Sequence, residues 1–170
     1  MKESYRKESF ARALSELGIE DRGLAVELGS TFARNRRSIS DVYPDVKPAL
    51  TELAKDYRLG LLTNGAPDLQ NTKLDASGLG SYFESITISG EFGYGKPSPE
   101  IFARALEGLN AKAETTIMSG DSLTRDVAGA QAVGVRGGWM NREDRTNESD
   151  VIPDATVTSM DELVVYLESE

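Results

Sequence analysis

Hydrophobic residues recur every three or four positions in the first part of the chain, and this spacing predicts two helices. The first helix is predicted over residues 4–17 and ends at Gly18, and the second starts near Asp21. Their apolar stripes consist of Phe10, Leu14 and Leu17 in the first helix and Leu24, Leu28 and Phe32 in the second. We expect the two helices to pack as a helical hairpin.

From Val46 onward the pattern changes to short apolar strands that alternate with helix-length segments. Strands are predicted at residues 59–62, 86–88, 115–118, 136–140 and 155–158, the last as an edge strand. Helices are predicted at residues 46–56, 68–77, 99–109, 123–133 and 160–167, the last with a capping box of Ser159 and Glu162. Each crossover between parallel strands returns over the sheet in the right-handed sense. The predicted fold class is therefore α/β, a Rossmann-like parallel sheet with helices on both faces, plus a partial helical cap at the N-terminus.

Composition narrows the chemistry that this fold can carry. The 170 residues are 39% hydrophobic, which suits one sizeable core with a small accessory piece. Without Cys or His, a disulfide framework, a thiolate nucleophile, a Cys or His zinc site and a serine triad are all excluded. No membrane-length apolar run and no signal-peptide pattern stand in the sequence, so the expected location is cytoplasmic, without membrane partners. The net charge of −9 disfavours nucleic acid as a partner.

Polar residues follow three of the predicted strands. Thr63-Asn64-Gly65 follows the first strand, Lys96 comes after the second, and Asp121 follows the third. Because ligands of such sheets bind at the carboxyl ends of the strands, a hydroxyl, an ammonium and a carboxylate are expected to converge at one edge. Taken singly, Thr63-Asn64-Gly65 is explained as a turn and Asp121 as a helix cap. Lys96 is not explained in this way, because the start of the following helix does not require a lysine there. The conjunction favours an anion-binding site.

The segments LLTNG, GKPSPEIF and SGDSLTRDVAGAQAVGV resemble the second, third and fourth motifs of the haloacid dehalogenase superfamily. Most members of that superfamily are magnesium-dependent phosphatases, and the resemblance runs from about Tyr43 to Asn141. It implies that a small phosphorylated metabolite is the substrate and Mg²⁺ the cofactor.

The resemblance also implies roles for individual residues. Thr63 would bind the transferring phosphoryl group, helped by the backbone N–H groups of Asn64 and Gly65. Lys96 would neutralise charge between the nucleophile and the phosphate. The metal is assigned to two carboxylates: Asp121 would bind Mg²⁺, and Asp126 would support the metal shell or its water.

The resemblance divides the chain into residues 1–43, similar to part of a helical cap, and residues 44–170, an α/β core that lacks its first strand. That strand in the family ends in an Asp-x-Asp motif, whose aspartates act as nucleophile and as general acid and base. This sequence has no such motif. In the family the strand lies between the strands that here end at Thr63 and Asp121. Three expectations follow: the sheet closes across the gap, another chain fills it, or the chain is a fragment, which is the favoured interpretation.

Several functions stay open at this point. The favoured one is a magnesium-dependent phosphomonoester hydrolase in an intact parent protein, with this chain inactive or impaired. A non-catalytic phosphate-binding or regulatory protein is the first alternative. A 2-haloacid dehalogenase-like hydrolase is the second, although the intact Gly120-Asp121 and Asp126 count against it. A homo-oligomer or a complementing chain is the expected protein partner.

Overall fold

The structure is a computed structural model that describes residues 2–38 and 41–169, with the side chains of residues 8–35 and 41–169. The chain forms two compact units, residues 1–41 and residues 42–170, which are described separately. Within the described residues, no helix combines the length and the apolar character needed to cross a membrane.

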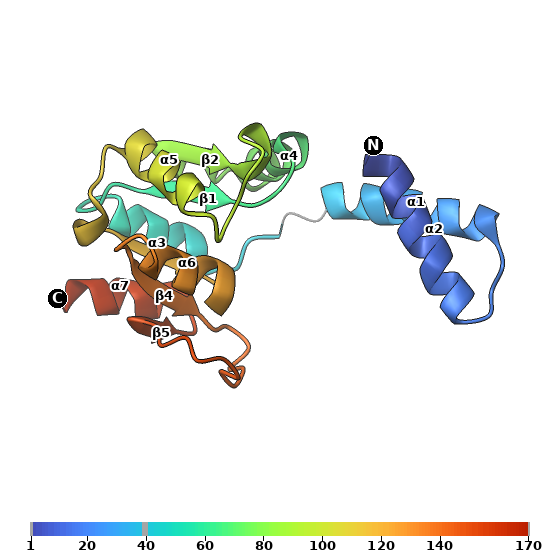
Figure 1. The fold of residues 1–170 in the computed structure, drawn as a ribbon. Coiled ribbons are helices and arrows are strands. Elements are labelled where there is room, and N and C mark those ends of the chain that lie inside the picture. The colour runs from blue at the N-terminus through green and yellow to red at the C-terminus, as the bar shows by residue number, and fades with distance from the viewer. Residues whose placement is uncertain (1, 39–40, 170) are drawn as a thin grey trace. The chain divides into compact units, whose positions relative to one another are not determined.

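The smaller unit is a helical hairpin of α1 (Lys2–Glu16) and α2 (Arg22–Ser38) (Figure 1). Phe10 and Phe32 meet edge to face, with ring centroids 5.9 Å apart. Leu14 is buried as predicted, but Leu17 is 76% exposed, because α1 ends at Glu16 and the chain has already turned away. The predicted apolar stripe was therefore wrong at its last position.

The larger unit contains five parallel strands and the helices that cover them (Figure 1). The strands are β1 (Gly60–Thr63), β2 (Ser85–Ile88), β3 (Ile117–Gly120), β4 (Arg136–Met140) and β5 (Ala155–Val157). The helices are α3 (Val46–Leu53), α4 (Pro67–Ser77), α5 (Pro99–Leu109), α6 (Ala128–Gln131) and α7 (Met160–Glu168). Short 3-10 turns lie at Gly80–Tyr82, Ser89–Glu91 and Ala113–Thr115, and a π-helical turn lies at Leu123–Val127. The predicted α/β class and Rossmann-like parallel arrangement are confirmed.

Several predicted elements have other bounds than those observed; the helix predicted at residues 46–56, for example, ends at Leu53. β3 begins two residues after the predicted start of its strand, because Ala113–Thr115 form a 3-10 turn first. The helix predicted at residues 123–133 is a π-helical turn followed by the short α6. Its wider first turn is set at Ser122, whose carbonyl accepts from Val127 N–H at 3.2 Å and whose hydroxyl accepts from Arg125 N–H.

The capping box at α7 is present in an altered form. Ser159 Oγ accepts the N–H of Glu162 at 3.1 Å, as predicted. The Glu162 carboxylate, however, accepts the N–H of Thr158 at 2.7 Å, one residue before the cap. The start of α7 is therefore held from both sides, as a capping box requires.

The sheet is divided into two parts: β1 pairs with β2, and β3, β4 and β5 form a separate three-stranded sheet. Among the described residues, no strand lies between β1 and β3. The edges of these two strands contribute to the walls of a groove of about 820 Å³. The expectation that the sheet closes across this gap was wrong. Two separate apolar clusters stabilise the unit, one around Ile101 and Phe102 of α5 and one around Leu163 and Leu167 of α7.

Candidate active site

Lys96 lies between the carboxyl ends of β1 and β3. Its Nζ donates to the carbonyl oxygen of Leu62 in β1 at 2.9 Å and lies 2.7 Å from Oδ1 of Asp126, in the turn after β3. The two charged side chains are only 10% and 5% exposed. The predicted lysine is thus at the edge of the sheet, and its closest charged partner is Asp126.

Asp126 is fixed by the geometry of the turn that carries it. Its Oδ2 accepts the N–H of Ser122 at 2.9 Å, while Oδ1 faces the Lys96 charge without a hydrogen bond of good geometry. The carboxylate packs directly on Gly120, where an added Cβ would come within 2.5 Å of the Asp126 Cγ atom. Glycine at residue 120 is therefore needed for the buried ion pair to form.

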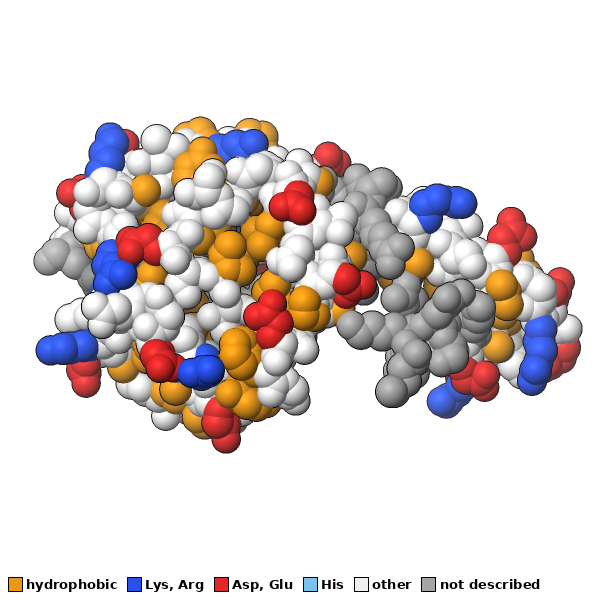
Figure 2. Space-filling model, turned by 90° about the horizontal axis from the view of Figure 1, so that it is seen from above, with side chains coloured by type: hydrophobic (Ala, Val, Ile, Leu, Met, Phe, Trp, Pro, Cys, Tyr) orange, Lys and Arg blue, Asp and Glu red, His pale blue; other side chains and the backbone are white. Residues whose placement is uncertain are grey.

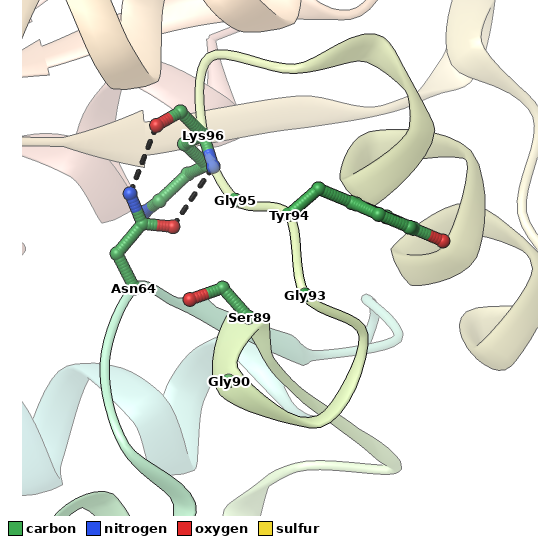
Figure 3. A pocket seen from close by; sticks show the side chains of 7 residues that line it. All are labelled: Asn64, Ser89, Gly90, Gly93, Tyr94, Gly95 and Lys96. Carbon is green, nitrogen blue, oxygen red and sulfur yellow. Dashed lines mark hydrogen bonds between the residues drawn. The ribbon is translucent and has the colours of Figure 1, made fainter. Parts of the chain in front are cut away.

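The side chain of Asn64 holds the backbone of Lys96 (Figure 3). Asn64 Nδ2 donates to the Lys96 carbonyl at 2.9 Å, and the Lys96 N–H donates to Asn64 Oδ1 at 2.8 Å. A Cβ at Gly95 would approach Asn64 Oδ1 to 2.6 Å, so the clamp also requires this glycine. The resemblance assigned a role only to the backbone N–H of Asn64, and its side-chain role was missed because turn chemistry explained the residue.

Thr63 ends β1 and is half-buried beside the same edge. Its Oγ1 accepts a hydrogen bond from Gln70 Nε2 at 2.8 Å, and Gln70 also donates to the Asn64 carbonyl at 2.9 Å. Gln70 therefore orients the threonine hydroxyl, a role that no motif or spacing in the sequence indicates. The N–H of Gly65, expected to face a phosphate, donates to Ser89 Oγ at 3.0 Å.

Asp121 follows β3 and is exposed to solvent. Its carbonyl accepts from the Trp139 indole N–H at 3.3 Å, which ties its backbone to β4. Mg²⁺ takes one or two carboxylates together with phosphate oxygens and water, and Asp121 fits the place of one such ligand. The two carboxylate oxygens of Asp126 already contact Lys96 and the N–H of Ser122. The described residues contain no group of three or more acidic or other metal-ligating side chains.

A shallow cavity of about 360 Å³ opens beside Lys96 (Figure 3). It is lined by Asn64, Ser89, Gly90, Gly93, Tyr94, Gly95 and Lys96. Three of these residues are glycines, so the cavity presents mainly backbone groups. The Tyr94 side chain points away from the Asn64 clamp.

Comparison with known families agrees with this arrangement. Residues 5–134 match the family described as haloacid dehalogenase-like hydrolase, and the chain belongs to this family. The resemblance of its three motifs to the haloacid dehalogenase superfamily is thereby confirmed.

Curated relatives include several phosphatases. The phosphoserine phosphatase of Thermus thermophilus is 39% identical over 160 residues, which cover 94% of this chain and 64% of the relative. The N-acylneuraminate-9-phosphatase of Mus musculus is 36% identical over 154 residues, which cover 89% of this chain and 62% of the relative. This chain thus spans less than two thirds of the length of these relatives.

Solved structures share the fold over almost the whole chain. The HAD-hydrolase YfnB of Bacillus subtilis, in a crystal structure bound to magnesium, has a TM-score of 0.85 at 28% identity, covering 98% of this chain and 73% of that one. A 2-haloacid dehalogenase of Pseudomonas syringae has a TM-score of 0.73 at 30% identity, covering 98% of this chain and 71% of that one.

Proposed function

We propose that these residues form the phosphoryl-binding part of a magnesium-dependent phosphomonoester hydrolase that acts on a small phosphorylated metabolite. The observation that carries this proposal is the buried Lys96 ammonium, held between the end of β1 and the turn after β3 by the Leu62 carbonyl and Asp126. A fixed cation at a site shielded from water stabilises a phosphoryl anion more than a mobile surface lysine does. The phosphatases among the relatives support the same conclusion.

Each group has a distinct part in this proposal. Because Thr63 Oγ1 already accepts from Gln70, its hydroxyl hydrogen is left to donate to a phosphoryl oxygen. The N–H of Asn64 adds a backbone donor, whereas the N–H of Gly65 would first have to leave Ser89. Asp121 would hold Mg²⁺, whose charge neutralises phosphoryl oxygens when it is bound. Asp126 keeps Lys96 in place and supports the metal shell indirectly.

A carboxylate nucleophile is missing from this arrangement. Of the carboxylates that follow β3, Asp121 is the one that we assign to the metal and Asp126 is the one that pairs with Lys96. We therefore propose that these 170 residues bind phosphate and turn over phosphomonoesters poorly or not at all. A phosphate-binding regulatory protein is the alternative that this observation favours.

The test is calorimetric titration with inorganic phosphate, with and without Mg²⁺. We expect Mg²⁺ to increase the phosphate affinity, and Asp121→Asn to remove that increase. Asp75→Asn, an exposed carboxylate on α4, is the matched control and should behave as the wild type. Absence of phosphate binding, or an equal effect of both variants, would contradict the proposal.

Turnover assays separate the remaining alternatives. Hydrolysis of p-nitrophenyl phosphate that disappears in Asp121→Asn would show that the chain is itself active and would refute its proposed impairment. The Pseudomonas syringae neighbour supports a dehalogenase as the second candidate. Halide release from 2-chloropropionate in the presence of EDTA would favour that candidate over the phosphatase.

A further inference from the structure

One side chain contacts three consecutive residues of the loop that follows β1. Gln70 Nε2 donates to Thr63 Oγ1 at 2.8 Å and to the Asn64 carbonyl at 2.9 Å, so both hydrogens of its amide are used. The same atom would lie 2.8 Å from a Cβ at residue 65, where the backbone has a φ of +150° and the residue is glycine. The loop is therefore shaped around Gln70, which lies near the start of α4.

The orientation of this amide is fixed by its two partners. A carbonyl oxygen only accepts hydrogen bonds, so the atom that contacts the Asn64 carbonyl must be the amide nitrogen and not the amide oxygen. The nitrogen in turn only donates, so Thr63 cannot direct its own hydroxyl hydrogen at Gln70. That hydrogen has no acceptor among the described residues.

We propose that Gln70 is a positioning residue that fixes the direction of donation at Thr63, so that the hydroxyl offers its hydrogen to a bound oxyanion. The inference rests on the proposed function, in which Thr63 binds a phosphoryl group. It adds that the donor state of Thr63 depends on a side chain of α4 and not on the threonine alone.

The neighbouring peptide is held in the same way. The peptide between Asn64 and Gly65 has its C=O bound by Gln70 and its N–H bound to Ser89 Oγ at 3.0 Å. Because a peptide is planar, it cannot turn while both hydrogen bonds are kept. The Thr63 hydroxyl is thus attached to a loop held in one conformation, and donors fixed before the ligand arrives stabilise its charge most effectively.

The surroundings make the direction of this hydrogen important. Figure 2 shows hydrophobic side chains gathered around a hollow in the surface of the larger unit. The groove between β1 and β3 is lined mainly by such side chains. Apolar groups give an anion no hydrogen bonds, so a polar donor at the strand ends contributes to binding only if it points at the ligand.

The test is a double-mutant cycle, measured by calorimetric titration with inorganic phosphate. Thr63→Val removes the hydroxyl and should weaken phosphate binding by about tenfold or more. Gln70→Met leaves the hydroxyl free to rotate and should weaken binding by about fivefold. Added to Thr63→Val, the same change should weaken binding by no more than about twofold, because no hydroxyl is left to direct. A residue that only holds the loop to α4 would have the same effect in both backgrounds.

Gln70→Glu tests the direction of donation itself. At about pH 7 the ionised carboxylate accepts the hydrogen of Thr63 and turns it away from the anion, whereas a protonated carboxyl group can donate again. Residue 70 is half-buried, and a glutamate there beside a bound anion has a raised pKa, so donation should return in part at about pH 5. Asn71→Asp adds the same charge at the next, exposed residue of α4 and is the matched control. Relative to this control, Gln70→Glu should bind phosphate at least about tenfold more weakly at about pH 7, and the difference should shrink by about threefold or more at about pH 5.

The comparison with Asn71→Asp removes the contribution of other titrating groups. Phosphate itself and the charged side chains of the strand ends and of α4 are common to both variants; these side chains are Lys96, Asp121, Asp126, Asp68, Lys73 and Asp75. The chain also has no histidine, whose ordinary pKa of about 6.5 lies in this range.

Failure of this inference and failure of the proposed function give different results. If the wild type binds phosphate but Gln70→Met weakens binding equally with and without the Thr63 hydroxyl, Gln70 is not a positioning residue, and the proposed function stands. The same holds if Gln70→Glu shows no recovery relative to its control. If the wild type binds no phosphate, the proposed function fails and this inference fails with it. Circular dichroism checks that each variant is folded, and Gln70→Met and Gln70→Glu are two independent changes at the residue.

Discussion

Two ion pairs in the larger unit connect segments that are distant in the sequence, and they differ in burial. The side chains of Lys96 and Asp126 are 10% and 5% exposed, and those of Arg142 and Asp45 are 20% and 14% exposed. Arg142 also lies over the Tyr43 ring, with its guanidinium carbon 4.2 Å from the ring centroid. The less buried pair therefore has additional packing that explains its place in the structure.

The more buried pair links the end of β1 to the turn after β3, because Lys96 Nζ also donates to the Leu62 carbonyl and Asp126 also accepts the N–H of Ser122. Burying two charges costs several kcal/mol of desolvation, and apolar side chains of similar volume often stabilise a core as well or better. Asp45 joins the segment before α3 to two places: it pairs with Arg142, which follows β4, and it accepts the N–H of Met160 at the start of α7 at 2.8 Å. The Lys96–Asp126 pair lies instead at the strand ends, where a cation is useful for binding an anion. If the proposed phosphate site is correct, the Arg142–Asp45 pair maintains the fold and the Lys96–Asp126 pair also serves the site.

The largest expected effect comes from removing one partner of the more buried pair. Asp126→Ala leaves the Lys96 ammonium buried without a counter-charge, and the free energy of unfolding should fall by about 3–5 kcal/mol. Urea denaturation measures this loss. Asp45→Ala, at the more exposed pair, should cost clearly less.

The double variant Lys96→Met/Asp126→Leu is the control for this prediction. It removes both charges and should recover most of the stability, while phosphate binding is lost. A double variant as unstable as Asp126→Ala would show that the ion pair is needed for folding, and the distinction between the two pairs would then fail.

A smaller effect is expected from Asn64→Ala, which removes both hydrogen bonds to the Lys96 backbone. Stability should fall by about 1–3 kcal/mol, and phosphate affinity should fall as Lys96 loses its fixed position. Asn64→Asp keeps the acceptor for the Lys96 N–H but loses the donor to its carbonyl and adds a negative charge beside the anion site, so its phosphate affinity should fall at least as far as that of Asn64→Ala.

Asn147→Ala provides the matched control for Asn64. Asn147 also holds a loop through its side chain, accepting from Ser149 N–H and donating to the Val151 carbonyl, but it does not contact Lys96. It should leave phosphate affinity unchanged. If both variants reduce phosphate affinity equally, the Asn64 clamp does not position the lysine.

The sequence predicted those elements whose ends carry local signals. α5 begins after Ser98 with Pro99 at its first turn, and both of its bounds were predicted as observed. β4 was also predicted with its observed bounds. The π-helical turn after β3 was not predicted, because it depends on hydrogen bonds at Ser122 that a helical periodicity does not reveal.

The site was predictable only to the level of neighbouring strand ends. The rule that ligands bind at the carboxyl ends of parallel strands places Thr63, Lys96 and Asp121 at one edge of the sheet. It does not say which charged side chain the lysine contacts. The pairing with Asp126 depends on the close approach of that side chain to Gly120. The split of the sheet likewise depends on pairing between strands far apart in sequence, which apolar patterns within each strand do not encode.

The smallest effect is a pH dependence at the less buried pair. Burial raises the pKa of Asp45, but hydrogen bonds from Met160 N–H and Arg142, with the Arg142 charge, more than offset this and hold the pKa below its usual value. The ionised carboxylate therefore stabilises the fold at pH values above the unfolded pKa, about 3.9, and this contribution is lost as pH falls through the lower folded pKa. Asp45→Asn should lower the free energy of unfolding by about 1 kcal/mol at neutral pH, and the difference from wild type should shrink at about pH 3. Urea denaturation at both pH values tests this, with Asp75→Asn as the exposed control. If the difference in unfolding free energy between Asp45→Asn and the wild type does not change with pH, packing on Tyr43, and not charge, maintains this contact.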